Sequence, residues 1–324
     1  MEENTEQRID LTLFSEKIQE LKDRIASVIV GQEQTVDLVL TAILANGHVL
    51  IEGVPGVAKT LLARLTARLI DADFSRVQFT PDLMPSDVLG TTVFNMKTNA
   101  FDFHQGPIFA DIVLVDEINR APAKTQAALF EVMEERQISI DGTTHRMGDL
   151  YTILATQNPV EQEGTYKLPE AQLDRFLMKI TMDYPSLEEE VNILERHHTN
   201  AALVKLDDIT PAITKEELLS LRAFMNQVFV DRTLLQYIAL IVQQTRTSKA
   251  VYLGASPRAS VAMLQSSKAY ALLQGRDFVT PEDIKFVAPY VLQHRLILTA
   301  EAEMEGYSPV KVTQRLIDKV EVPK

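Results

Sequence analysis

The 324-residue chain contains no cysteine and no tryptophan. Without cysteine there is no disulfide framework, no zinc–thiolate centre and no cysteine nucleophile. Long apolar runs are absent as well, because no stretch approaches the roughly 18 residues that a membrane-spanning helix needs. The start, Met1-Glu2-Glu3-Asn4, lacks the basic and apolar parts of a signal peptide. We therefore expect a cytoplasmic protein without an integral membrane segment.

The chain carries 45 acidic and 32 basic side chains, which give a formal net charge of −13. Residues 1–200 have a net charge of −15 and residues 201–324 a net charge of +2. Proteins that follow a nucleic-acid backbone generally carry a basic stripe, so the composition disfavours nucleic acid as a partner. The asymmetry fits two solvated domains of unequal charge, and it also fits two surfaces with different partners.

The first half alternates short apolar runs with helical patterns. The runs predict strands over 48–52, 76–79, 112–115, 151–155 and 178–181. Strands that alternate with helices indicate a parallel sheet covered on both faces. The second half has helical spacing over 215–228, 234–247, 258–273 and 281–291. The sequence therefore predicts an α/β domain over 1–184 and a smaller all-α domain over 185–324, linked near Tyr184-Pro185-Ser186.

A glycine-bearing loop follows the first predicted strand and opens a helix. It reads Gly53-Val54-Pro55-Gly56-Val57-Ala58-Lys59-Thr60-Leu61. In a phosphate-binding loop of this kind, backbone N–H groups turn toward phosphate oxygens at a helix N-terminus. The lysine approaches the β- and γ-phosphates, and the threonine hydroxyl can bind Mg²⁺. Ala58 stands where the motif usually has glycine. A strand-to-helix turn without a ligand is the alternative interpretation.

The third predicted strand ends in two adjacent carboxylates, Asp116 and Glu117. We expect this strand to neighbour the strand before the loop. Successive side chains of a strand point to opposite sides, so Asp116 can bind Mg²⁺ near Thr60 while Glu117 orients and deprotonates a water molecule. The alternative is that the two acids merely close a strand.

Several further stretches occur with the loop and the acidic strand in the order and spacing of AAA+ ATPases. They are Val30-Gly31-Gln32, the residues 116–121, 155–159, 164–172 and 173–176, and the residues 254–258. More narrowly, the chain resembles MoxR-type AAA+ ATPases, a helix-2-insert clade related to magnesium-chelatase motor subunits. An alanine at the position of Ala58 is typical of that family. The resemblance implies a three-layer AAA+ core with a five-stranded parallel sheet, followed by a helical lid.

The resemblance also implies roles for single residues. Asn158 matches sensor 1, which places the attacking water, although an asparagine before proline also caps turns. Arg175 matches the arginine finger, which acts on the nucleotide of an adjacent subunit, although Asp-Arg pairs are often surface ion pairs. Arg258 matches sensor 2, which contacts nucleotide in cis or at the interface, or is simply a first-turn residue. Residues 30–32 match the stretch that lines the adenine pocket.

Two hairpins are predicted inside the α/β domain. One pairs 91–94 with 101–104, and the other pairs 137–140 with 143–146 through the turn Asp141-Gly142. They resemble the helix-2 insert and the hairpin before sensor 1, which in related machines project toward the ring pore and contact the client protein. Hairpins without a client contact are the alternative.

Taken together, the resemblance implies a Mg²⁺-dependent ATPase with ATP as its nucleotide. It also implies a homo-oligomeric ring, expected to be a hexamer, which remodels or matures client proteins with a von Willebrand factor A domain partner. A DNA-directed motor and a nucleotide-gated scaffold without turnover are the competing functions. A metal-chelatase motor subunit is a near relative of the favoured one.

Overall fold

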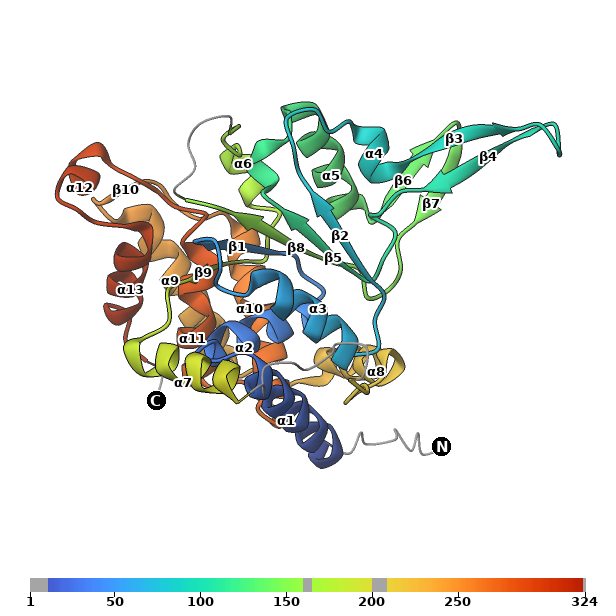
Figure 1. Ribbon diagram of the computed structural model, residues 1–324. Coiled ribbons are helices and arrows are strands. Elements are labelled where there is room, and N and C mark those ends of the chain that lie inside the picture. The colour runs from blue at the N-terminus through green and yellow to red at the C-terminus, as the bar shows by residue number, and fades with distance from the viewer. Residues whose placement is uncertain (1–10, 160–164, 200–208, 323–324) are drawn as a thin grey trace, which may run out of the picture.

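The computed structural model describes residues 11–159, 165–199 and 209–322. Gly164, the first residue of the stretch 164–172 that resembles the family, lies outside the described residues. The centre of the molecule is a five-stranded sheet with the order β2-β5-β8-β1-β9, and every neighbouring pair is parallel (Figure 1). The strands are β1 (Val49–Gly53), β2 (Phe74–Gln78), β5 (Ile112–Asp116), β8 (Thr152–Gln157) and β9 (Met178–Met182). The predicted α/β core with a five-stranded parallel sheet is confirmed.

The order of the strands differs from the prediction in one respect. β5, which carries Asp116, does not neighbour β1, because β8 lies between them. The expectation of adjacent strands was wrong, since spacing along the chain does not show which later strand is inserted between two earlier ones. As a result, the end of β8, which Asn158 directly follows, lies between β1, which precedes the phosphate loop, and β5, which carries the acidic pair.

The helices of the first half cover the two faces of the sheet. They are α1 (Leu11–Val28), α2 (Glu33–Leu44), α3 (Lys59–Leu69), α4 (Pro85–Leu89), α5 (Ala123–Glu135) and α6 (Glu170–Leu173), with one 3₁₀ turn, η1 (Ile118–Arg120). Successive side chains of β1 point to opposite faces of the sheet. Val49 and Ile51 belong to the cluster with α2 and α3, whereas Leu50 belongs to the cluster with Phe130 of α5. Each face of the sheet therefore has its own apolar cluster.

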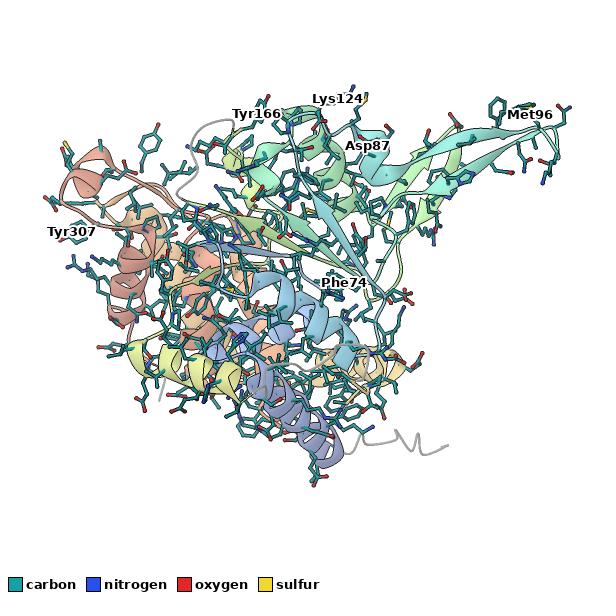
Figure 2. The ribbon with its side chains drawn as sticks, viewed as in Figure 1. Phe74, Asp87, Met96, Lys124, Tyr166 and Tyr307 are labelled. Carbon is teal, nitrogen blue, oxygen red and sulfur yellow. The ribbon has the colours of Figure 1, made fainter. Side chains whose placement is uncertain are left out.

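Both predicted hairpins are present. β3 (Gly90–Asn95) pairs with β4 (Ala100–Gln105), and β6 (Gln137–Ile140) pairs with β7 (Thr143–Arg146). Asp141 and Gly142 both have positive φ, which is the geometry of a two-residue turn of the predicted kind. The β3–β4 hairpin extends beyond the rest of the fold, and Met96 lies at its tip (Figure 2). The Met96 side chain is 89% exposed.

The second half forms a helical lid, as predicted. Its elements are α7 (Leu187–His198), α8 (Lys215–Phe224), η3 (Met225–Gln227), α9 (Arg232–Thr247), α10 (Pro257–Leu273), α11 (Pro281–Leu292), α12 (Ala300–Met304) and α13 (Pro309–Asp318). It also contains a short antiparallel pair that the sequence did not predict, β10 (Val251–Leu253) with β11 (Ile297–Leu298). The apolar residues of α9, α10 and α11 belong to the same cluster as those of α1 and α2. The lid is therefore packed directly against the core.

No helix among residues 11–159, 165–199 and 209–322 is both long and apolar enough to cross a membrane.

One buried histidine, directly before β1, joins the backbone of β8 to the backbone of α5. The Ile153 N–H donates to His48 Nδ1 over 3.0 Å, so the ring proton lies on Nε2, which donates to the Met133 carbonyl over 3.0 Å. Burial, with the nearby charge of Arg136, lowers the pKa of His48 from 6.5 to about 3. Folding therefore requires the neutral ring.

This histidine makes stability depend on pH in a predictable direction. Between pH 6.5 and about 3 the unfolded chain binds one proton more than the folded chain at His48. The free energy of unfolding should therefore fall by about 1.4 kcal/mol per pH unit from this group as the pH drops below 6.5. His48→Gln should be less stable at pH 7 but show a shallower slope between pH 4 and 6, measured by urea denaturation. Equal slopes for both proteins between pH 4 and 6 would contradict the lowered pKa of His48. As the control, their free energies of unfolding should change in parallel between pH 7 and 8.

Candidate functional site

The loop between β1 and α3 has the backbone that phosphate binding requires. Gly56 has φ +89°, and no described heavy atom lies within 4 Å of the position that a Cβ would occupy there. Lys59 begins α3, and its Nζ donates to the Gly53 carbonyl at 2.5 Å and the Val54 carbonyl at 3.2 Å. The ammonium group is thus folded back over the loop, at the positive end of a helix.

Ala58 adopts a left-handed backbone conformation, with φ 61° and ψ 23°. This explains why glycine is usual at the position, because an alanine Cβ approaches backbone atoms too closely in that region. The loop nevertheless keeps the conformation with alanine, so the departure from the general motif does not remove the site.

A pocket of about 270 Å³ lies beside the loop. Its walls come from the end of α1, the loop and α7, and include Val28, Ile29, Val30, Gln32, Val57, Ala58, Leu61, Pro185, Ile193, Arg196 and His197. Most of these side chains are apolar, which suits the flat face of a nucleotide base. Val30 and Gln32, which the family resemblance assigns to the adenine pocket, both line this pocket.

The sequence does not predict the far wall of this pocket. The predicted link at 184–186 leads straight into α7, whose Ile193, Arg196 and His197 face the pocket. The Ser186 hydroxyl accepts from the Glu189 N–H while the Glu189 carboxylate accepts from the Ser186 N–H, a capping box readable from the sequence. Gly31 allows this approach, because a Cβ there would lie 2.4 Å from the Glu189 carboxyl carbon.

Asp116 and Glu117 lie at the carboxyl end of β5, as predicted. Asp116 is 6% exposed; its Oδ1 accepts from the Thr156 hydroxyl at 3.1 Å and its Oδ2 pairs with Arg76 Nε at 2.6 Å. The Glu117 N–H donates to the same Thr156 hydroxyl oxygen at 3.0 Å. The tip of β8 therefore fixes the position of both acids.

The Glu117 backbone is left-handed, with φ 57° and ψ 50°, although glutamate rarely adopts that conformation. Its carboxylate Oε2 accepts from Gln78 Nε2 at 2.7 Å and pairs with Arg120 Nε at 3.1 Å. The unusual backbone turns Glu117 away from the direction that β5 would give it, and strained residues of this kind cluster at functional sites. Asn158 follows β8 at the same edge of the sheet and is 8% exposed.

The two arginines that matched the family lie elsewhere. Arg175 NH1 is 2.8 Å from a Glu134 oxygen and donates to the Phe130 carbonyl at 2.7 Å. Arg258 NH2 pairs with the other Glu134 oxygen at 3.2 Å. Both line a second hollow, of about 310 Å³, together with His48 at the start of β1. One carboxylate thus holds both guanidinium groups.

These positions divide the site between two edges of one sheet. The phosphate loop follows the carboxyl end of β1, whereas the arginines lie near the beginnings of β1 and β9. β1 has five residues, so the two edges are roughly 16 Å apart at about 3.3 Å per residue. The described conformation therefore does not bring Arg175 or Arg258 to the phosphate loop of its own chain.

Two family models match the chain. The ATPase family associated with various cellular activities (AAA) matches residues 48–178, and the AAA lid domain matches residues 243–318. Among curated proteins, the chain is 44% identical over 306 residues to chaperone MoxR1 of Mycobacterium tuberculosis, covering 92% of this chain and 80% of that protein. The chain belongs to the MoxR family of AAA+ ATPases.

Two further curated proteins and one solved structure are similar to this chain over nearly its full length. Protein MoxR of Methylorubrum extorquens is 30% identical and covers 91% of both chains, and YeaC of Bacillus subtilis is 47% identical and covers 93% of both. A crystal structure from Cytophaga hutchinsonii matches with a TM-score of 0.89 at 40% identity, covering 97% of each chain. Each of these three matches therefore spans both the core and the lid of this chain.

The left-handed Ala58 of this MoxR-family chain can be tested directly. Ala58→Gly should raise the free energy of unfolding by about 0.5–1 kcal/mol, because the relief of the strained conformation exceeds the entropy that glycine adds to the unfolded chain. The measurement is chemical denaturation without nucleotide. Ala63→Gly inside α3 is the matched control and should lower stability by about 1 kcal/mol or more. Destabilisation by both changes would contradict the explanation.

Proposed function

We propose that this chain is a Mg²⁺-dependent ATPase whose active site is completed by a second copy in a closed ring, and which uses hydrolysis to remodel client proteins. The observation that carries the proposal is the division of the site between opposite edges of the sheet. A chain with the phosphate loop at one edge and two arginines at the other can complete the site by head-to-tail contact. Repetition of that contact closes a ring when the rotation allows it. A hexamer is the form we infer from the family.

The first edge supplies the nucleotide site. The loop 53–60 would bind the phosphates, Lys59 would exchange its two carbonyl contacts for the β- and γ-phosphates, and the apolar pocket beside Val30 and Leu61 would take the base. The donors for a metal also fit, because the Thr60 hydroxyl and Asp116 are the oxygen ligands that Mg²⁺ prefers. Arg76 already pairs with Asp116, so that carboxylate lies where a cation is favoured. Mg²⁺ bound there would neutralise charge on the β- and γ-phosphates.

Glu117 and Asn158 would act on the attacking water. Glu117 accepts its proton while the water oxygen attacks the γ-phosphorus, and the bond to the β–γ bridging oxygen breaks to leave ADP and phosphate. Before that step Glu117 must leave Gln78 or Arg120, since both bind its Oε2. These two contacts hold the base in place until nucleotide is bound.

The second edge supplies the arginines to the neighbour. Arg175 as the finger and Arg258 as sensor 2 would exchange Glu134 for the γ-phosphate of the adjacent subunit. Planar guanidinium groups stabilise the charge that develops on the phosphoryl oxygens. The shared contact with Glu134 supports an interfacial role for Arg258 over a role in cis.

The hairpins support a protein client. Val93, Phe94, Met96 and Phe101 on the β3–β4 hairpin are all at least 46% exposed. Exposed apolar side chains at the end of a long projection suit contact with polypeptide better than contact with phosphates. A von Willebrand factor A domain protein is the partner that we infer from the family.

Two substitutions separate nucleotide binding from turnover. Lys59→Ala should lose ATP binding, because the loop loses its cation. Glu117→Gln should bind ATP with near-normal affinity but hydrolyse it at least about 100-fold more slowly, because the base is removed. Binding is measured with a fluorescent ATP analogue and turnover by phosphate release. Equal loss of binding in both variants would overturn the assigned roles.

The same pair tests the client class. Glu117→Gln loaded with ATP should retain a client on the ring in a pull-down from the source cells, and Lys59→Ala, which cannot load, is the matched control. Proteins enriched with Glu117→Gln over Lys59→Ala support a protein-remodelling motor. Enrichment of nucleic acid would favour the DNA-directed motor.

A further inference from the structure

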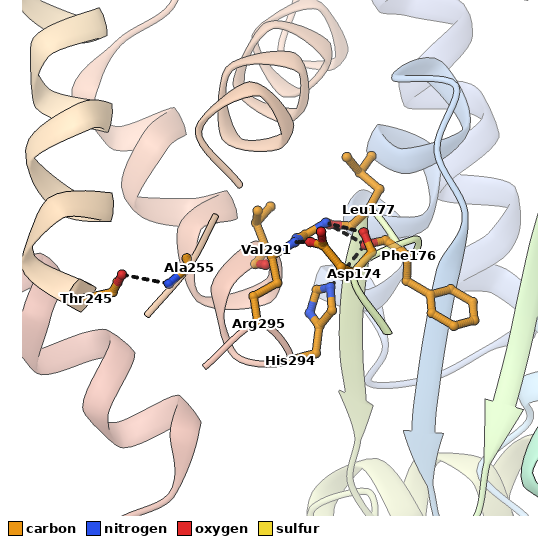
Figure 3. A network of polar contacts seen from close by, with 8 residues as sticks. All are labelled: Asp174, Phe176, Leu177, Thr245, Ala255, Val291, His294 and Arg295. Atoms are coloured by element: carbon orange, nitrogen blue, oxygen red, sulfur yellow. Dashed lines mark hydrogen bonds and ion pairs between the residues drawn. The ribbon is translucent and has the colours of Figure 1, made fainter. Parts of the chain in front are cut away.

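Three consecutive lid residues contact the segment that carries the proposed finger. Gln293, His294 and Arg295 follow the last turn of α11, and we call them the lid clamp. Their partners outside the lid lie in residues 174–179, more than a hundred positions earlier in the chain, and Figure 3 shows those of His294 and Arg295. Such a concentration of polar contacts from one tripeptide onto one segment is not required by the apolar packing of α11.

Arg295 uses all five of its N–H donors in this position. Its Nε donates to Asp174 Oδ1 at 2.6 Å, and NH2 donates to the Asp174 carbonyl at 3.2 Å and the Phe176 carbonyl at 2.7 Å. NH1 donates to the Leu177 carbonyl at 3.1 Å and to the Val291 carbonyl of its own helix. The side chain is 4% exposed, so these bonds form away from water. The guanidinium therefore ties α11 to both sides of residue 175.

The other two clamp residues extend the contact. His294 Nε2 is 3.0 Å from the Phe176 carbonyl, which also accepts from Arg295, and Gln293 Nε2 donates to the Lys179 carbonyl on β9 at 2.5 Å. Burial beside Arg295 lowers the pKa of His294 well below its ordinary value, so the ring is neutral and donates from Nε2. The segment is thus held from Asp174 to the second residue of β9.

The clamp binds backbone around Arg175 without occupying its guanidinium. Asp174 and Phe176, on either side of Arg175, are both bound by Arg295, while the Arg175 side chain remains 31% exposed and contacts Glu134. The backbone of the finger is therefore fixed, and its charged end is placed at the surface.

The lid also carries the second arginine. Arg258 lies in the first turn of α10, and α10 packs against α11 in the buried cluster. A movement of the lid would thus carry Arg258 directly and Arg175 through the clamp.

We propose that Arg295 is a positioning residue for the finger, which makes the lid and the segment 174–177 move as one unit. The lid of one subunit then sets the geometry of the active site of its neighbour. This inference rests on the proposed function, in which Arg175 acts in trans. It adds the residue that transmits lid position to the finger.

The test uses Arg295→Met in the full-length protein. Removing the donors should lower kcat for ATP hydrolysis by about 100-fold, the effect expected when a catalytic group is displaced by about 1 Å. The KM for ATP should change less than about twofold, because the variant's own nucleotide pocket lies at the other edge of the sheet. Arg295→Lys keeps the charge but not the fork of donors, and should show a smaller loss, about 10-fold. It carries the test if the Met variant does not fold.

Subunit mixing separates positioning from general damage. Glu117→Gln subunits cannot turn over ATP but carry an intact finger. An excess of them should restore turnover per Arg295→Met subunit toward the wild-type value, as it should for Arg175→Ala. Arg276→Met is the matched control, since Arg276 donates to Asp283 within the lid at 2.8 and 2.5 Å. Its kcat should stay within about twofold of wild type.

Each outcome decides the question. Recovery of both the Arg295 and the Arg175 variants, with the control unaffected, supports the positioning role. Recovery of Arg175→Ala alone overturns that role but leaves the trans finger intact. Failure of Arg175→Ala to recover overturns the trans finger and the inference with it. Wild-type kcat for Arg295→Met also overturns the inference.

Discussion

The length of the strands in the parallel sheet sets the distance between the two groups of candidate site residues. Because all five strands run in the same direction, everything that follows a strand gathers at one edge and everything that precedes a strand gathers at the other. Lys59, Glu117 and Asn158 follow strands and Asp116 ends one, whereas Arg175 precedes one. No side chain spans a distance of roughly 16 Å. The proposed arginine-assisted hydrolysis therefore needs a second subunit.

Charged side chains proposed to contact the metal or the nucleotide form ion pairs within the single chain. Arg76 pairs with Asp116 where a metal is proposed, and Glu134 pairs with Arg175 and Arg258 where the neighbour's phosphate is proposed. Arg76 carries the positive charge that a bound metal ion would bring, and Glu134 carries the negative charge that a phosphate would bring. The two Glu134 pairs are partly exposed and contribute little stability, so exchanging them costs little, whereas Asp116 is buried and keeps its bond to Thr156.

The sequence predicted what is encoded locally, namely the strands, the phosphate loop, the acidic pair and both hairpins. It did not predict that β8 lies between β1 and β5, because strand order is decided by packing across the sheet. It did not decide whether Arg258 acts in cis or at the interface, because the position of Arg258 depends on where the lid packs against the core. The α7 wall and the Arg295 contacts were missed for the same reason. The Ser186 and Glu189 capping box, the acidic first turn and the basic last turn were the local signs of α7.

We propose that a complete site exists only between two subunits. The most direct measurement is the rate of ATP hydrolysis per subunit at saturating Mg-ATP across a dilution series, with the molecular mass followed by light scattering in the same samples. The rate per subunit should fall toward zero at the concentration where the ring dissociates. A monomer that retains the full rate per subunit would contradict the claim.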